Sequence, residues 1–139
     1  EVPCFATWGS KNRSAFVRVP TSKPGKQLSR RIELRSPDPT CNPYLTMAVT
    51  LAAGMRGIQE GLELPAESSL PVERLAETDA VRLPRDLGQA VEAFEGSELM
   101  REVLGDHIFE YLLREKRAEW AGYSQTVTDW ELRHYYGGF

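Results

Sequence analysis

Four arginines and one glutamate in a short stretch near the start of the chain are the residues best suited to do chemistry. They are Arg13, Arg18, Arg31, Glu33 and Arg35. The planar guanidinium group of arginine suits two-point contact with a carboxylate or a phosphate. A glutamate between arginines on alternate strand positions can be an ion-pair partner, or a ligand for a hard cation. The residues by themselves predict an anion-binding face and leave both roles of Glu33 open.

The charge of the chain is unevenly distributed, which supports that prediction. The net charge is −3, but residues 1–35 hold eight lysines and arginines against two glutamates. A basic segment within an acidic chain favours a local anionic partner, such as a phosphate or a carboxylate. Because nucleic-acid-binding domains are usually basic overall, we expect no nucleic-acid partner.

The composition is typical of one folded domain. The chain has 139 residues, of which 41% are hydrophobic, so it can bury a sizeable core. No apolar run approaches the roughly 18 residues that cross a membrane, and the first residues do not resemble a signal peptide. The two cysteines, Cys4 and Cys41, are too few for a disulfide framework. We therefore expect a cytoplasmic protein without a membrane partner, and the missing initiating methionine indicates a fragment or a processed chain.

Short strands are expected to position the arginines. Residues 5–8, 15–19 and 31–35 are rich in strand-forming residues or alternate polar and apolar side chains. Within the last of these, Ile32 and Leu34 should face the core, and the charged residues should share the opposite face. Three short strands cannot make a stable sheet with an open face and two edges, so residues outside the chain should complete it.

Helix signals dominate the rest of the chain. Asn42 followed by Pro43 predicts a helix start and Gly61 predicts its end, with apolar residues at helical spacing between them. Further N-cap residues predict helices that begin after Asp86, Ser97, Asp106 and Thr128. Residues 62–85, which contain three prolines, are interpreted as an irregular surface excursion. Short antiparallel strands in the first third followed by a mainly helical remainder predict an α+β fold.

The arginine motifs together resemble one family. The sequence reads NRSAFVRVP at residues 12–20, RIELRSPDP at 31–39 and NPYL at 42–45. This combination resembles the C-terminal part of the catalytic domain of bacterial-type glutamine synthetases, and the likeness covers nearly all 139 residues. By this resemblance, residues 1–139 are the C-terminal portion of that catalytic domain. The motif-bearing strands lie in residues 1–35, and a mainly helical part lies in residues 42–139.

The resemblance implies a reaction and a role for each motif residue. In that family ATP phosphorylates the side-chain carboxylate of glutamate, and ammonia displaces phosphate from the γ-glutamyl phosphate intermediate. Because only Arg31, and not Arg30, keeps the one-residue spacing to Glu33, the family role is assigned to Arg31. The implied roles are phosphoryl stabilisation for Arg13, ATP binding for Arg18 and Arg31, glutamate binding for Arg35 and coordination of Mg²⁺ or Mn²⁺ for Glu33.

The resemblance also implies what this chain lacks. Much of the family's active site lies upstream of the matching region, so we expect the fragment alone to be inactive. The complete protein should use glutamate, ATP and ammonia and form a homo-oligomer, a dodecamer in this family. Residues 68–76 contain no tyrosine, so the adenylylation control of some members is not expected. Two alternatives are a related γ-glutamyl–amine ligase and a non-catalytic assembly or regulatory module.

Overall fold

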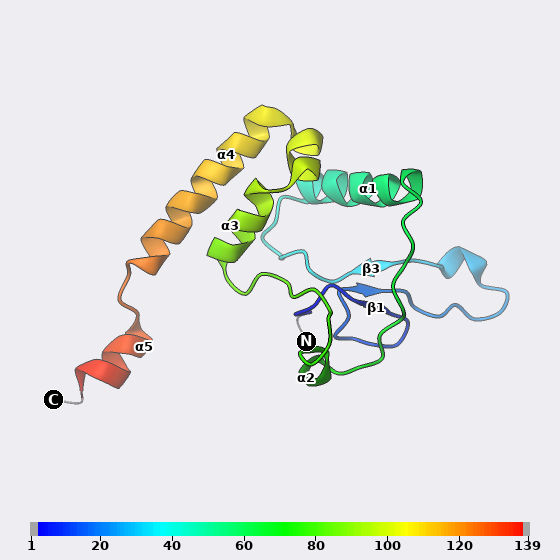
Figure 1. The fold of residues 1–139 in the computed structure, drawn as a ribbon, viewed down its shortest axis with the longest axis horizontal. Coiled ribbons are helices and arrows are strands. Elements are labelled where there is room, and N and C mark those ends of the chain that lie inside the picture. The colour runs from blue at the N-terminus through cyan, green and yellow to red at the C-terminus, as the bar shows by residue number, and fades with distance from the viewer. Residues whose placement is uncertain (1–2, 138–139) are drawn as a thin grey trace. The chain divides into compact units, whose positions relative to one another are not determined.

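A computed structural model describes residues 3–137 of the chain (Figure 1). The chain divides into two compact units, Glu1–Arg85 and Asp86–Phe139. The strands and the first two α-helices belong to the first unit, and the remaining helices belong to the second. No helix in the described part of the chain is both long and apolar enough to cross a membrane. Both cysteines are exposed, and neither forms a disulfide with a described residue.

The first unit contains a small three-stranded sheet in the order β1 (Trp8–Gly9), β2 (Val17–Arg18) and β3 (Glu33–Leu34). The pair β2–β3 is antiparallel, as predicted. The pair β1–β2 is parallel, so the prediction of antiparallel strands is wrong for this pair. The reason is the connection, residues 10–16, which turns the chain back so that it runs beside β1 in the same direction. Hydrogen bonds of 3.0 Å from Val17 N–H to the Thr7 carbonyl and from Val19 N–H to the Gly9 carbonyl fix this register.

The apolar core of the first unit is small. Its buried hydrophobic side chains include Phe5, Ala15 and Leu75, the last on the short helix α2 (Val72–Leu75). Leu34 is half-buried, but Ile32 is 69% exposed, so the prediction that both face the core is wrong for Ile32. Ile32 lies just before the two-residue strand β3, where the described residues bury little of its side chain.

Residues 62–85 are tied to the first strand region rather than forming a free surface excursion. Ala6 N–H donates to the Val81 carbonyl at 2.8 Å, and Leu83 N–H donates to the Cys4 carbonyl at 2.9 Å. The segment is mostly exposed and irregular, as predicted. The sequence did not indicate its attachment, because backbone hydrogen bonds across the unit leave no periodic pattern.

The helix α1 (Pro43–Gln59) begins and ends where the sequence indicates. The Asn42 side chain accepts hydrogen bonds from Tyr44 N–H at 3.0 Å and Leu45 N–H at 3.3 Å. These contacts satisfy amides that the first helical turn leaves unpaired. Gly61 follows the helix with a φ of 63°, a conformation that favours glycine.

No residue of α1 is buried within the described part of the chain. Met47, Leu51 and Ile58 are 71%, 69% and 76% exposed, whereas Leu45 and Val49 are half-buried. The apolar residues at helical spacing therefore leave part of this helix exposed among the described residues.

The second unit consists of helices whose caps match the sequence signals. They are α3 (Leu87–Glu95), α4 (Glu98–Ser124), α5 (Asp129–Glu131) and the π-helix η2 (Leu132–Tyr136). Asp86, Ser97 and Thr128 each accept a backbone hydrogen bond at a helix start. Gly105, with φ 70° and ψ 157°, interrupts α4 where one predicted helix ends and the next begins. Residues 138–139 lie outside the described residues.

The helices α3 and α4 share an apolar cluster. Val91, Phe109 and Leu113 are its buried members. The Phe94 ring stacks on the Phe109 ring with centroids 4.6 Å apart. The Arg101 guanidinium lies 4.2 Å from the centre of the Phe109 ring, so a cation covers one side of the cluster. Unit two therefore has a core of its own.

Candidate anion-binding site

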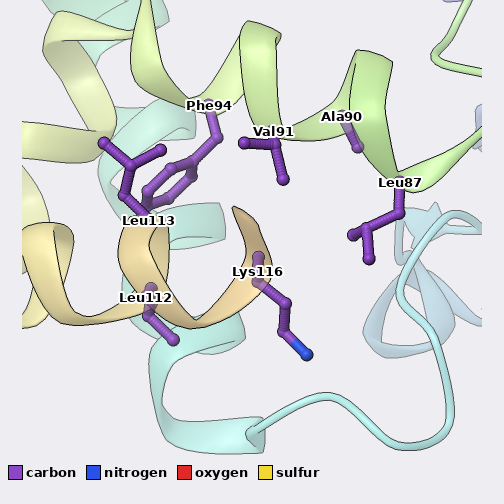
Figure 2. A pocket seen from close by; sticks show the side chains of 7 residues that line it. All are labelled: Leu87, Ala90, Val91, Phe94, Leu112, Leu113 and Lys116. Atoms are coloured by element: carbon purple, nitrogen blue, oxygen red, sulfur yellow. The ribbon is translucent and has the colours of Figure 1, made fainter. Parts of the chain in front are cut away.

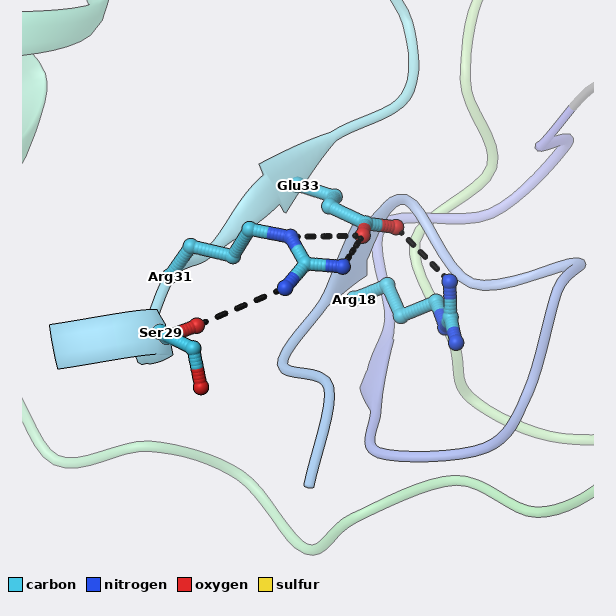
Figure 3. Close-up of polar contacts among 4 residues, drawn as sticks. All are labelled: Arg18, Ser29, Arg31 and Glu33. Atoms are coloured by element: carbon cyan, nitrogen blue, oxygen red, sulfur yellow. Dashed lines mark hydrogen bonds and ion pairs between the residues drawn. The ribbon is translucent and has the colours of Figure 1, made fainter. Parts of the chain in front are cut away.

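The candidate site centres on Glu33, whose carboxylate joins two arginines (Figure 3). Arg18 and Glu33 are cross-strand partners in the β2–β3 register. Arg18 Nη1 donates to Glu33 Oε2 at 2.9 Å. Arg31 contacts the other oxygen, Oε1, with Nε at 3.2 Å and Nη2 at 3.0 Å. The antiparallel pairing of two short strands thus brings together three of the five predicted site residues.

A second contact holds Arg31 in place. Its Nη1 donates to the Ser29 carbonyl at 3.4 Å, at the end of the 3₁₀ turn η1 (Gln27–Ser29) (Figure 3). Arg31 therefore links the loop that precedes β3 to the carboxylate on β3. Its neighbour Arg30 is also exposed, but the Arg30 side chain makes no hydrogen bond or ion pair with any described residue.

The two arginines keep Glu33 ionised. Partial burial acts to raise the pKa of Glu33, but the hydrogen bonds and positive charges of Arg18 and Arg31 outweigh it, so the pKa is lowered. The Arg18 and Glu33 side chains are each 28% exposed, and that of Arg31 is 58% exposed. Arg18 Nε is buried without a hydrogen-bond partner among the described residues. A buried unpaired donor calls for an acceptor from elsewhere, which suits an anion or a further part of the protein.

Arg13 and Arg35 occupy different positions. Arg13 is exposed in the 10–16 turn and makes no hydrogen bond or ion pair with any residue between 3 and 137. Arg35 is half-buried directly after β3, and its N–H donates to the Phe16 carbonyl at 3.0 Å. The Arg13 side chain is therefore accessible to a ligand, whereas the backbone of Arg35 is hydrogen-bonded to the strand region.

The described residues do not form a complete metal site. Within residues 3–137 no group of three or more histidine, cysteine, aspartate or glutamate side chains is suited to hold a metal ion. Glu33 can offer one carboxylate, but both of its oxygens already contact arginines. The residues present fit one ligand position at most, and other ligands would have to come from outside the described chain.

Sequence reasoning missed the long-range contacts that fix the turn carrying Arg13, and with them the part played by Glu67. The Glu67 carboxylate accepts a hydrogen bond from Ser10 N–H at 2.6 Å. Asn12 Nδ2 donates to the carbonyls of Ser68 at 3.2 Å and Leu70 at 3.0 Å. The partners in these contacts are 56 to 58 positions apart, so no local pattern could have indicated them.

A groove between α3 and α4 in the second unit lacks comparable chemistry (Figure 2). Its volume is about 310 Å³, and it is lined by Leu87, Ala90, Val91, Phe94, Leu112, Leu113 and Lys116. The one charged lining group, the Lys116 amine, pairs with Glu119 at 2.5 Å. An apolar lining with one paired amine suits packing better than acid–base or phosphate chemistry, so the candidate site remains with the arginines.

Comparisons with known proteins agree on one family. The glutamine synthetase catalytic domain matches residues 1–135. A glutamine synthetase of Mycolicibacterium smegmatis is 50% identical over 140 residues, which cover 97% of this chain and 31% of that protein. The glutamine synthetase of Mycobacterium tuberculosis is 52% identical over 141 residues, with the same coverage. The chain thus spans about 31% of the length of these curated relatives.

Solved structures give the same result. A complex of GmaS with ADP superimposes with a TM-score of 0.83 and 34% identity, over 97% of this chain and 30% of that one. The cryo-EM structure of Plasmodium falciparum glutamine synthetase has a TM-score of 0.78 at 17% identity, over 97% of this chain and 34% of that one, and supports the fold alone. Family match, sequence identity and fold together establish that this chain belongs to the glutamine synthetase catalytic-domain family.

Proposed function

We propose that the complete protein is an ATP-dependent glutamate–ammonia ligase, and that this chain supplies its arginine face. The observation that carries the proposal is the Arg18–Glu33–Arg31 network, found in a chain of the glutamine synthetase family. ATP would phosphorylate the glutamate side chain, and ammonia would displace phosphate from the γ-glutamyl phosphate. Ammonia is favoured over other amines because the curated relatives at 50% and 52% identity are named glutamine synthetase.

The arginines would divide the anionic groups of the substrates between them. Arg13, exposed and without a polar partner among the described residues, would stabilise the charge that develops on the transferred phosphoryl group. Arg18 and Arg31 would contact the ATP phosphates while Glu33 fixes their orientation. Arg35 would hold a carboxylate of the substrate glutamate through its planar guanidinium fork.

Glu33 would also offer one ligand to a divalent cation, Mg²⁺ or Mn²⁺. Its lowered pKa keeps the carboxylate charged, as a hard-cation ligand must be. A cation bound there would offset negative charge on phosphate oxygens. The competing role, an ion-pair partner for Arg18 and Arg31 alone, predicts the same contacts and no dependence of metal affinity on Glu33.

A kinetic comparison of Arg35→Lys with the parent tests the proposal in the full-length protein. Lysine keeps the charge but loses the two-point contact, so the KM for glutamate should rise about tenfold or more while the KM for ATP stays within about twofold. Arg30→Lys, a change at an exposed arginine of the same basic segment, is the control and should leave both constants unchanged. Equal changes in both KM values for Arg35→Lys would contradict the assigned role.

A metal titration of Glu33→Gln separates the two roles of Glu33. Glutamine keeps the size of the side chain and removes its charge. If Glu33 is a ligand, the activity curve should shift to higher Mg²⁺ or Mn²⁺ concentration and the maximal rate should fall. The parent's metal curve and turnover in the variant would leave only the ion-pair role.

The isolated chain should have no ligase activity, because it supplies at most one metal ligand from the described residues. ATP-dependent glutamine formation by the purified 139-residue chain would contradict this expectation. Assembly of the complete protein into a homo-oligomer, a dodecamer by family resemblance, is part of the same proposal. So is a cytoplasmic location, which fits two cysteines that form no disulfide with a described residue.

A further inference from the structure

The turn that presents Arg13 is fixed on one side by the sheet and the core. Val17, the first residue of β2, pairs with β1, and Ala15 is fully buried at 0% exposure. Within the turn, the Asn12 side chain accepts a hydrogen bond from Ser14 N–H at 2.9 Å. Arg13 therefore lies between Asn12, whose side chain is hydrogen-bonded, and the buried Ala15. The direction in which the Arg13 side chain leaves the turn depends on how the turn is held.

A second segment, residues 65–70, is hydrogen-bonded to the other side of the turn. Ser68 N–H donates to the Trp8 carbonyl at 2.9 Å, and Trp8 Nε1 donates to the Pro65 carbonyl at 2.8 Å. Asn12 Nδ2 adds hydrogen bonds to two carbonyls of the same segment. These contacts join one chain segment to both β1 and the residue directly before Arg13.

The approach of the two segments is close enough to require glycine. A Cβ atom added at Gly9 would lie 2.7 Å from the Ser68 carbonyl oxygen, a separation that real Cβ atoms essentially never adopt. The obstructing atom is backbone, so it cannot move aside as a flexible side chain would. The 65–70 segment is therefore seated directly against the turn.

Glu67 makes the charged contact between the 65–70 segment and the turn. Its Oε1 accepts hydrogen bonds from both the N–H and the hydroxyl of Ser10, the first residue of the turn. Hydrogen bonds to an ionised acceptor are shorter and stronger than neutral ones. The hydroxyl of Ser10 and then its amide lower the pKa of Glu67, with a smaller contribution from the charge of Lys11, so the carboxylate is ionised at neutral pH.

We infer that Glu67 is a positioning residue, which holds the turn at Ser10 and so aims Arg13 at the transferred phosphoryl group. The inference rests on the proposed role of Arg13. Glu67 acts through the backbone of the turn, since its contact is with Ser10, three positions before Arg13. Misplacement of a catalytic group by about 1 Å can lower a rate by as much as about a hundredfold, so loss of one anchor is expected to reduce turnover.

Steady-state kinetics of Glu67→Ala and Glu67→Gln in the full-length protein test the inference. For Glu67→Ala we expect kcat to fall about tenfold or more, with the KM values for glutamate and ATP and the melting temperature close to those of the parent. Glu67→Gln keeps an oxygen that can accept from Ser10 and should recover most of the lost kcat. Glu63→Ala, which removes an exposed carboxylate from the adjoining residues, is the control and should match the parent.

A double-mutant comparison shows whether Glu67 acts through Arg13. In an Arg13→Lys background, Glu67→Ala should cause little further loss, because the group that it aims has already been replaced. A full additional loss in that background, or an unchanged kcat for Glu67→Ala alone, would overturn the positioning role and leave the role of Arg13 intact. Parent-like kcat in Arg13→Lys would instead overturn the proposed role of Arg13, and the inference with it.

Discussion

The arginine-bearing turn and sheet of the first unit differ from the α3–α4 pair of the second in what holds them together. The turn is fixed by polar contacts between residues 56 to 58 positions apart, through Asn12, Ser10 and Glu67. The helices are fixed by caps within a few residues and by a shared apolar cluster around Phe109. Changes in the first region should therefore affect the chemistry more than the stability, and changes in the second should do the reverse.

This difference has a physical cause. Apolar packing stabilises a region roughly in proportion to the area that it removes from water, but it gives little directional control. Hydrogen bonds contribute less net free energy, yet they fix positions closely. A region that must aim charged side chains is well served by the second kind of contact, and a scaffold by the first.

The largest effect on stability is expected from Phe109→Ala. The Phe109 side chain has 0% exposure, and its removal leaves a cavity between α3 and α4. Large-to-small changes of this kind cost about 3–5 kcal/mol. Hydrogen exchange of the α3 and α4 amides in the full-length protein measures the loss, and unchanged protection would contradict a core centred on Phe109.

A smaller loss is expected from Gly88→Ala, which tests the close packing of α3 on α4. A Cβ atom at Gly88 would lie 2.6 Å from Trp120 Nε1, and overpacking typically costs about 1–3 kcal/mol. Gly122→Ala is the matched control, because nothing lies within 4 Å of its Cβ position. The control should be neutral or slightly stabilising. Equal hydrogen-exchange protection of α3 and α4 in both variants would contradict the close packing of Gly88 on Trp120.

In the turn, Asn12→Ala should cost about 1–3 kcal/mol of stability, the sum expected for three partly exposed hydrogen bonds, and should lower kcat clearly. The change removes the two donated hydrogen bonds to the 65–70 segment and the one accepted from Ser14. Asn12→Asp keeps the acceptor and loses the donors, so its kinetics separate the two contributions. Thermal unfolding and kcat measured together decide the outcome, and a large stability loss with unchanged kcat would reverse the comparison.

The smallest effect is expected from acid. The pKa values of Asp38 and Glu67 are lowered, mainly by hydrogen bonds from Thr40 and Ser10, and that of Glu33 is lowered by its arginines. Stability from a lowered pKa is present above the ordinary carboxyl value and is lost as pH falls through the lowered one. These three carboxylates lie in the first unit. In the second unit the pKa of Glu131 is also lowered, by hydrogen bonds with Thr128 at the start of α5 and not in α3 or α4. The amides of the first unit should therefore lose hydrogen-exchange protection on acidification before those of α3 and α4. Simultaneous loss in both units would contradict the difference.

Much of the helical architecture could be predicted from the sequence. Asn42, Asp86, Ser97 and Thr128 act as caps, and Gly105 separates two helical segments, as predicted. These signals succeed because each involves residues at most a few positions apart. The contact of Glu33 with Arg31 was also anticipated, since the two residues lie two positions apart. Its second partner is Arg18, which the antiparallel pairing places opposite it, and not Arg35 as the alternating strand pattern suggested.

The sequence by itself determined the caps, the existence of the strand that carries Glu33, and the motifs that mark the family. Only the tertiary structure decided the parallel β1–β2 pairing, the attachment of residues 65–70 to the Arg13 turn and the exposure of α1. Apolar spacing indicates which side of a helix can be buried, but burial requires a partner that the spacing does not specify. Glu67 likewise looks like an ordinary surface carboxylate until the fold brings Ser10, 57 positions away, within 2.6 Å of its oxygen.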